Sequence, residues 1–414
     1  MTDRPPAESR PTEPRLTTRE AAERLGVKPE TVYAYVSRGQ LTSRRGANGR
    51  GSTFDAAEVD ALARKGRRDA QPAGDLVFRT GITLIEQDRY YYRGVDAVEL
   101  ADRYMYEEVV GWLLTGRLEP GRRFVTPREP LEAARDAVRA LPGHASTMDR
   151  LRVAVVAASV TDPLRFDLDP EMVVGTGTCL ISTLVDATPV VGRNHRGEGP
   201  LAWRLWPRLT DRPADEAVLR VLDKALCLLI DHDLAASTLA ARVAASARAH
   251  PYAVVSAGLG ALEGPLHGAA SGLAHRMLTE VLERGGAAPV VADHLRAGRR
   301  VPGLGHRLYA GRDPRAEALF AALEDVPQAQ PALAAARDVV DTTARHTTLH
   351  ANVDLALAVL SVASGMPADA GETVFAVART AGWIAHALEE YAERPLRMRP
   401  SGQYNGPRPP RPLP

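Results

Sequence analysis

The sequence lacks the features that mark several large classes of protein. Its 414 residues include only two cysteines, Cys179 and Cys227, each inside an apolar stretch and without a metal-binding motif around it. This pattern excludes a disulfide framework and favours buried thiols in a reducing compartment. No apolar run approaches the roughly 18 residues of a membrane-spanning helix, and residues 1–14 are too polar for a signal sequence. We therefore expect a cytoplasmic protein without membrane contact.

The chain also has almost no net charge, with 52 Lys and Arg against 51 Asp and Glu. Hence no global attraction to nucleic acid or acidic surfaces is expected. The charge is nevertheless uneven, because residues 15–68 contain 12 basic and 6 acidic residues, an excess of +6 that leaves −5 for the remainder. This segment is predicted to be a separate unit, and a chain of this length is expected to form two or three domains.

Two short helices are predicted at the start of the basic segment. Residues 17–20, Thr-Thr-Arg-Glu, form a capping-box pattern, and Gly26 ends the helix that follows it. Pro29 opens a second helix, which faces Val32 inward and stops near Gly39. Two helices joined by a tight glycine turn indicate a helix-turn-helix domain, which is predicted here for residues 15–68.

The second half of the basic segment resembles the wing of MerR-type and excisionase-type domains. Residues 41–54 have the composition of a hairpin, and Asp55 is predicted to cap a third helix that runs through Lys65. The second helix offers few cations to phosphates or base edges, so DNA contacts are expected mainly from the wing. The candidate DNA-binding residues are Arg38, Arg44, Arg45 and Arg50. A protein-docking or dimer-organising role remains the alternative.

The rest of the chain is predicted to be mainly α-helical. A proline-containing linker at 69–75 precedes it, and strand-like alternation is rare. Residues 1–14 are predicted to be a disordered tail and residues 408–414 a flexible tail. Apolar residues recur at three-to-four spacing in the stretches 216–230, 315–324, 332–346 and 373–390.

Three distant segments each place one ionisable side chain among Gly, Pro or Asn residues: His267 in 264–268, His306 in 302–307, and Asp354 after Asn352. A carboxylate can take a proton from carbon, and two imidazoles can hold oxygens on which charge develops, so the trio suits carbon–carbon bond formation through an enolate. This chemistry requires no metal and no organic cofactor. Each residue taken singly also suits a structural role, such as a helix N-cap for Asp354.

The motifs around these residues occur in the order and spacing of the citrate synthase family, which includes 2-methylcitrate synthases. The resemblance rests on Gly-Pro-Leu-His-Gly at 264–268, on 303–309 followed by Asp-Pro-Arg-Ala at 313–316, on Asn-Val-Asp at 352–354, and on 378–386. It covers about residues 76–407. It implies a mainly α fold with a large helical domain and a smaller one, at about 268–370, that closes over substrates, usually in a homodimer.

The resemblance also implies roles for individual residues. Asp354 would be the base, His267 would donate to the enolate oxygen, and His306 would polarise the ketone of oxaloacetate. The two carboxylates of oxaloacetate require cationic forks, for which arginine is suited. The matching substrate-binding residues are His232, Arg315, Arg379 and Arg399, the last reaching the partner subunit, and the CoA-binding residues are Gly303, Gly305, Arg307 and Arg312.

The implied function is condensation of acetyl-CoA and oxaloacetate with water to give citrate and CoA, through an enol or enolate and citryl-CoA, without a cofactor. Propionyl-CoA is an alternative donor, because one methyl group is discriminated by only about 1–3 kcal/mol. A DNA-binding regulator that senses CoA esters or oxaloacetate is a second alternative. Small or apolar residues that depart from the family pattern leave acyl-CoA choice open: Ala235, Ser271, Ala310 and Leu355.

Overall fold

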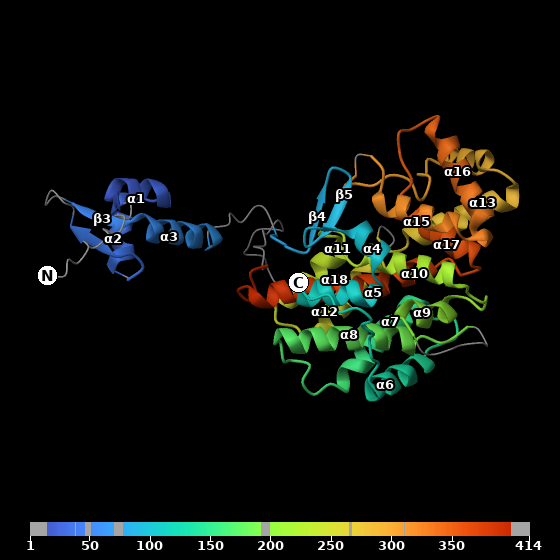
Figure 1. The fold of residues 1–414 in the computed structure, drawn as a ribbon, viewed down its shortest axis with the longest axis horizontal. Helices are drawn as coiled ribbons and strands as arrows, with labels where there is room; N and C mark the ends of the chain where they lie inside the picture. Colours follow the sequence, from blue (N-terminus) through green and yellow to red (C-terminus); the bar gives the residue numbers. More distant parts are fainter. Residues whose placement is uncertain are drawn as a thin grey trace, which may run out of the picture. The chain divides into compact units, whose positions relative to one another are not determined.

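The computed structural model describes residues 15–37, 39–45, 51–69, 78–191, 199–264, 267–309 and 311–398 (Figure 1). Its contacts divide the chain into two compact units, Met1–Phe78 with Pro400–Pro414, and Arg79–Arg399. The predicted tails, 1–14 and 408–414, lie outside the described residues. None of the described helices is both long enough and apolar enough to cross a membrane.

The N-terminal unit is a helix-turn-helix domain with a small antiparallel sheet. Its elements are β1 (Arg15–Thr17), α1 (Thr18–Leu25), α2 (Pro29–Ser37), β2 (Ser43–Arg45), β3 (Ser52–Asp55) and α3 (Ala56–Asp69), and the strand order is β1-β3-β2. The predicted capping box forms, since the Thr17 N–H donates to Glu20 at 2.7 Å, and Gly26 ends α1 with φ 68°. β2 and β3 pair as the hairpin predicted to be the wing.

A small apolar core holds this unit together. Its buried residues are Ala21, Ala22, Val32, Leu41, Phe54 and Val59. Asp55 caps α3 as predicted by accepting from the Ala57 N–H at 2.8 Å. The helix continues past the predicted end at Lys65 to Asp69, because the single Gly66 does not interrupt it. Apart from Asp69, the predicted linker 69–75 lies outside the described residues.

The second unit is mainly α-helical, as predicted, with one small antiparallel sheet in the order β4-β5-β6. Its elements are β4 (Thr83–Glu86), β5 (Arg89–Tyr92), β6 (Val95–Asp96), α4 (Ala97–Arg103), α5 (Tyr106–Thr115), α6 (Arg128–Arg139), α7 (Thr147–Val160), α8 (Pro170–Ala187), α9 (Leu201–Leu209), α10 (Glu216–Leu229), α11 (Ala236–Ser246), α12 (Pro251–Leu262), α13 (Ala270–Arg284), α14 (Ala287–Arg296), α15 (Pro314–Glu324), a 3-10 turn (Pro327–Ala329), α16 (Gln330–Ala344), α17 (Val353–Ala363) and α18 (Ala370–Ala392).

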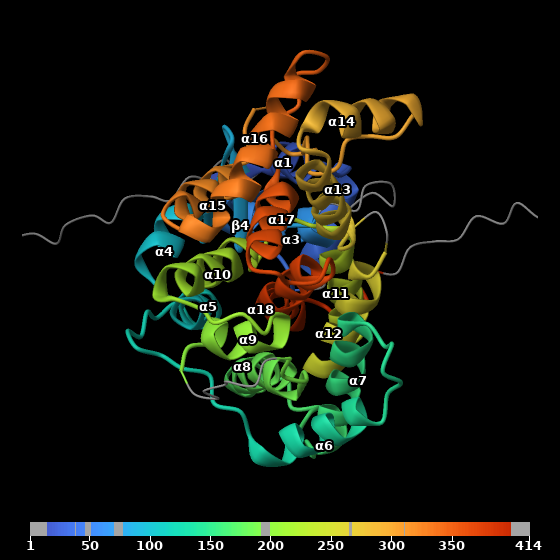
Figure 2. The ribbon, with the colours of Figure 1, turned by 90° about the vertical axis from the view of Figure 1, so that its right-hand side faces the viewer.

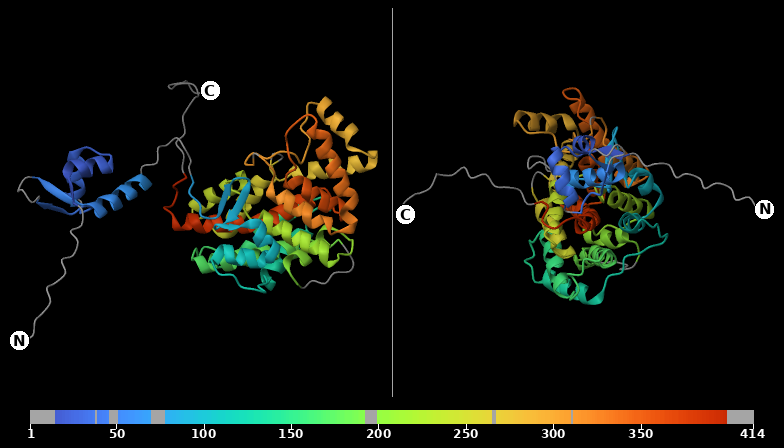
Figure 3. Two further views of the ribbon diagram at one scale, coloured as in Figure 1. Left: turned by 45° about the horizontal axis from the view of Figure 1, so that its top comes forward. Right: turned by 90° about the vertical axis from the view of Figure 1, so that its left-hand side faces the viewer.

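The long helix α18 runs through the middle of this unit (Figure 2). It packs against α8, α10, α11 and α12, and almost every residue of its apolar middle part is buried. Helices α13 to α17, drawn in yellow and orange, gather on one side, where α13 packs against α14, α16 and α17 (Figures 2 and 3). These helices fall within the stretch 268–370, whose boundaries as a smaller domain stay a prediction.

Candidate active site

The loop that carries His306 is tied to the segment that precedes α17. The Gly305 N–H donates to the His350 carbonyl at 2.7 Å, and the Asn352 N–H donates to the Gly303 carbonyl at 3.0 Å. The side-chain amide of Asn352 donates to the Gly305 carbonyl at 2.9 Å. These bonds bring His306 to the N-terminus of α17, where Asp354 lies, although the two are 48 positions apart in sequence.

This close approach depends on the two glycines of the loop. Gly303 and Gly305 have φ values of 77° and 82°, in the left-handed region that favours glycine. A Cβ atom on Gly303 would lie 2.8 Å from the Cβ of Leu355, and one on Gly305 would lie 3.0 Å from a methyl carbon of Leu349. Both glycines therefore have a structural role in the backbone of the site, and their CoA-binding role stays a prediction.

Asp354 lies in the first turn of α17 and does not cap it. Asn352 is the N-cap, and its side chain accepts from the Asp354 N–H at 3.0 Å, so the N-cap alternative for Asp354 is wrong. The Asp354 carboxylate makes no hydrogen bond to another described residue. Burial raises its pKa to about 6, against the opposing effect of Arg315. The carboxylate is thus unengaged and more basic than an ordinary aspartate.

Arg315 is fixed beside the same helix end by Asp313. Its Nε and Nη2 donate to the two Asp313 oxygens at 3.0 and 2.8 Å, and both side chains are buried. Asp313 also accepts from the Val353 N–H at 3.1 Å, which links the pair to α17. Burial alone would lower the pKa of Arg315, but the Asp313 charge outweighs it and raises that pKa. The guanidinium stays charged.

His232, His306 and Tyr309 form an aromatic cluster. The ring centroids of the two histidines are 5.0 Å apart, and Tyr309 lies 4.9 Å from His306. Burial lowers the pKa of His306 to about 4 and places that of His232 well below its ordinary value, with Arg315 adding to both effects. Both imidazoles are therefore neutral at neutral pH. Because Nδ1 of His306 accepts from the Leu308 N–H at 3.1 Å, its proton is left on Nε2.

The His267 ring contacts Phe375, and Phe375 in turn contacts Arg379. Nε2 of His267 lies 2.8 Å from the Ser237 hydroxyl, and its ring centroid lies 5.9 Å from that of Phe375. The Phe375 ring in turn lies 4.5 Å from the guanidinium carbon of Arg379. Burial lowers the pKa of His267 to about 4, with a further contribution from Arg379, so this imidazole is also neutral.

Arg379 has donors that nothing in the described structure uses. It lies on α18 with 1% of its surface exposed, and its Nε donates to the Leu229 carbonyl at 2.9 Å. Nη1 and Nη2 are buried and have no hydrogen-bond partner among the described residues. Burial lowers its pKa, while Asp231 opposes that effect. A buried guanidinium with two unused nitrogens is suited to bind an anionic ligand.

A buried polar network holds the backbone next to His232. Asp231 accepts from the Thr83 hydroxyl at 2.6 Å and lies 3.2 Å from Nε2 of His386. The other nitrogen of His386 lies 2.6 Å from a guanidinium nitrogen of Arg242 on α11. His386 belongs to the motif 378–386, and this contact connects α18 to the residue that precedes His232.

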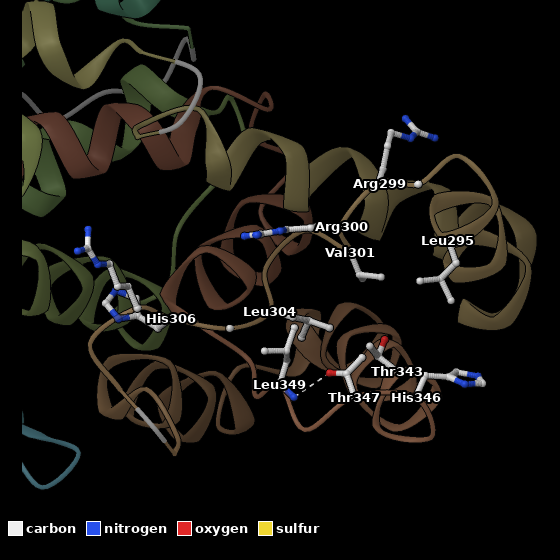
Figure 4. A pocket seen from close by; sticks show the side chains of 13 residues that line it. Leu295, Arg299, Arg300, Val301, Leu304, His306, Thr343, His346, Thr347 and Leu349 are labelled. Carbon is white, nitrogen blue, oxygen red and sulfur yellow. Dashed lines mark hydrogen bonds between the residues drawn. The ribbon is translucent and has the colours of Figure 1, made fainter.

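A cavity of about 870 Å³ opens next to His306. Arg307, one of the predicted CoA-binding residues, lines it, while Val301, Leu304 and Leu349 supply an apolar part (Figure 4). The sequence interpretation missed three further basic residues of the lining: Arg299, Arg300 and His346. The two arginines lie two and three positions before the motif at 302–307, where a search for cations near the motif would have found them.

Arg312 lies apart from this cavity. Its guanidinium pairs with Glu317 at 3.0 Å, and it lines a separate cavity of about 570 Å³. Arg44 and Arg45 are exposed on β2. Arg38, Arg50 and Arg399 lie outside the described residues. Within the described ranges, no group of three or more His, Cys, Asp or Glu side chains is placed to hold a metal ion.

The helical fold and the site together define a class of protein. Neutral imidazoles, one of them lining a large cavity, together with an unengaged carboxylate and buried arginines are suited to acid–base chemistry on anionic substrates. A family model described as "Citrate synthase, C-terminal domain" matches residues 73–401, and a "Helix-turn-helix domain" model matches residues 15–67.

Individual relatives agree with these models. The chain is 31% identical to a citrate synthase of Haloferax volcanii, over 80% of this chain and 94% of the relative. It is 28% identical to 2-methylcitrate synthase 2 of Corynebacterium glutamicum, over 78% and 90%. The citrate synthase structure from Pyrobaculum aerophilum superposes with a TM-score of 0.69 at 26% identity, covering 82% of this chain and 92% of that one. The chain belongs to the citrate synthase family. It is a condensing enzyme of that type with an N-terminal helix-turn-helix domain.

The structure describes the surroundings of three of the four residues that depart from the family pattern. Ala235 is the N-cap of α11 and offers no side-chain hydrogen bond to the helix. Leu355 is fully buried against Gly303, where it acts as a packing residue. The Ser271 hydroxyl is buried without a hydrogen-bond partner in the described part of the chain. Ala310 lies outside the described residues.

Proposed function

We propose that the second unit condenses acetyl-CoA with oxaloacetate and releases citrate and CoA. The observation that carries the proposal is the buried Arg379, whose Nη1 and Nη2 lack partners among the described residues. A charged group left unpaired in the interior is costly, so such a position indicates a ligand that supplies the missing acceptor. A carboxylate of oxaloacetate matches this guanidinium in charge and geometry.

The proposed reaction assigns one task to each of three side chains. The Asp354 carboxylate takes a proton from the methyl group of acetyl-CoA, and His267 donates a hydrogen bond to the enolate oxygen that forms. The new carbon nucleophile attacks the ketone carbon of oxaloacetate, whose oxygen is held by His306 through Nε2–H. Citryl-CoA results, and water then cleaves its thioester to give citrate and CoA. The raised pKa of Asp354 and the neutral state of both histidines support these roles. No cofactor takes part.

The substrates are assigned to neighbouring parts of the site. Oxaloacetate is proposed to bind to Arg315, Arg379 and His232, with Arg399 contributed by the partner subunit. The CoA portion is proposed to occupy the cavity next to His306, where Arg299, Arg300 and Arg307 offer charge to its phosphates and the leucines contact its apolar parts.

Thiol release from purified protein mixed with oxaloacetate and either acetyl-CoA or propionyl-CoA tests the proposal. We expect turnover with acetyl-CoA, absent without oxaloacetate and reduced by at least about 10²-fold in an Asp354→Ala variant. A higher kcat/KM with propionyl-CoA would instead assign the protein to the 2-methylcitrate synthases, a class represented among its relatives. No thiol release above the variant's level with either thioester would refute the condensing reaction.

We also propose that the enzyme is a cytoplasmic homodimer. Helix α7 and the segment after it expose four large apolar side chains, Val156, Val160, Leu164 and Phe166, each more than half accessible in the single chain. A second copy of the chain is the proposed cover for this surface. Light scattering is expected to give a mass twice that of one chain, and a Val160→Glu variant is expected to shift it toward the monomer. The free thiols Cys179 and Cys227 support a reducing compartment.

The N-terminal unit is proposed to bind DNA through its wing. Arg44 and Arg45 are exposed there and, unlike Arg24, which pairs with Asp60 at 2.7 Å, they form no salt bridge with a described residue. Anisotropy titration of duplex DNA at two salt concentrations tests this, with Arg44→Ala/Arg45→Ala as the comparison. Equal binding of DNA by the wild type and by the double variant would reject the proposal that the wing contacts DNA. Unchanged turnover after deletion of residues 1–70, without ligand-dependent DNA binding, would reject the regulator alternative.

A further inference from the structure

Tyr309 contacts three of the side chains proposed to bind oxaloacetate. Its hydroxyl lies 2.7 Å from Nε2 of His232. Its ring centroid lies 4.9 Å from that of His306 and 5.8 Å from the guanidinium carbon of Arg315. Tyr309 itself is 4% exposed. The buried Tyr309 side chain is therefore next to the imidazoles of His232 and His306 and to the guanidinium of Arg315.

The hydrogen bond between Tyr309 and His232 is between two neutral groups. Burial raises the pKa of Tyr309 and lowers that of His232, so the phenol keeps its proton and the imidazole carries a single one. No other described residue hydrogen-bonds the Tyr309 hydroxyl. Without it, the buried Nε2 of His232 would have no partner in the described structure, and ring contacts with Tyr90 and His306 would remain without the hydrogen bond that orients the imidazole.

The loop around Tyr309 is anchored from the β4–β5 turn. The Gly311 N–H donates to the Asp88 carboxylate at 3.3 Å, and Asp88 itself has φ 58°. A Cβ atom on Gly311 would lie 2.6 Å from a carboxylate oxygen of Asp88, so the Asp88 side chain approaches the Gly311 backbone closely. The tyrosine is thus attached to a supported segment rather than to a free loop end.

We propose that Tyr309 is a positioning residue of the oxaloacetate site, and that its hydroxyl sets the orientation of His232. This inference rests on the proposed function, because it assumes that His232, His306 and Arg315 meet oxaloacetate. Tyr309 makes no hydrogen bond to Asp354 or His267, and no ring contact with His267, among the described residues. Its effect is therefore expected on oxaloacetate binding rather than on proton removal from the thioester.

The experiment compares the full-length protein with Tyr309→Phe, which keeps the ring and removes only the hydroxyl. Tyr391→Phe is the matched control, because Tyr391 lies on α18, away from the Tyr309 loop, and its hydroxyl also makes one short hydrogen bond, to the Ala249 carbonyl at 2.6 Å. Calorimetry gives the Kd for oxaloacetate, and steady-state assays give separate KM and kcat values. We expect Tyr309→Phe to raise the Kd and KM for oxaloacetate about tenfold, with the KM for the thioester within about twofold of wild type.

The outcomes separate the two claims. An oxaloacetate Kd in Tyr309→Phe equal to that of wild type and Tyr391→Phe would overturn the positioning role while leaving the condensing reaction intact. Equal rises in both KM values, or the same loss in the control, would also overturn it, because they indicate a general structural effect. If the wild type binds oxaloacetate but shows no turnover, the proposed function is refuted. The ratio of the oxaloacetate Kd values of Tyr309→Phe and wild type would still decide the role of Tyr309.

Discussion

Asp313 and Arg315 form a buried pair in which both carboxylate oxygens accept from the guanidinium, at 3.0 and 2.8 Å. The pair stands at the start of α15, and through the Val353 N–H it also reaches the start of α17. Asp313 thereby fixes the position of Arg315 before any substrate arrives, which is the preorganisation that a dicarboxylate site requires.

Asp313→Asn is expected to destabilise the protein by about 3 kcal/mol, because it leaves a buried guanidinium without its counter-charge. Urea unfolding measures the loss. Glu317→Gln is the control, since the Arg312–Glu317 pair is exposed and its loss is expected to cost less than about 1 kcal/mol. Similar losses for the two variants would contradict the structural importance of the buried pair.

The rate is expected to rise with pH through about 6, the pKa of Asp354, because the base must be ionised to accept a proton. Below that value kcat should fall about tenfold per pH unit. His267 and His306, with pKa values of about 4, stay neutral over this range and add no second transition. A pH–rate profile that is flat down to pH 5 would contradict the assignment of the base.

Asp354→Asn is expected to be inactive yet more stable than wild type at neutral pH. The pKa of Asp354 is raised by burial, so folding favours its protonated form, and the stability of the wild type falls as pH rises through about 6. The asparagine does not ionise, so its advantage should be about 1–3 kcal/mol at neutral pH and should vanish near pH 4. Melting temperatures recorded across this pH range measure the difference. An advantage that persists unchanged at pH 4 would contradict the raised pKa.

Arg379→Met is expected to abolish stabilisation by oxaloacetate without lowering the melting temperature of the free protein. The substitution removes a buried guanidinium that uses only Nε within the described structure, and methionine fills similar apolar space. Thermal shift with and without oxaloacetate measures both effects. Arg312→Met, at an exposed arginine, should retain the full shift. If oxaloacetate raises the melting temperature of Arg379→Met as much as that of the wild type, the carboxylate-binding role of Arg379 is contradicted.

Local signals in the sequence predicted much of the fold. The predicted helix at 216–230 is α10, Glu216–Leu229, and the one at 373–390 lies inside α18, Ala370–Ala392. These helices were predictable because the three-to-four spacing of their apolar residues is a local signal. The end of α3 was less predictable, since a single glycine such as Gly66 only weakens a helix.

The site was predictable only where a motif carried the signal. The motifs pointed to His306 and Asp354, and the structure brings their segments together through Gly303, Gly305 and Asn352. The partners that orient the imidazoles were missed, because Ser237 and Phe375 meet His267, and Tyr309 meets His232, only through tertiary contacts. No spacing in the sequence encodes such contacts.

The most direct test of the central claim is mass spectrometry of the product formed from acetyl-CoA and oxaloacetate by wild type and by Asp354→Asn. The account predicts citrate and free CoA in equal amounts from the wild type, and neither above background from the variant. Citrate formation by the variant at the wild-type rate would contradict the assignment of Asp354 as the base, and CoA release without citrate would contradict the condensation itself.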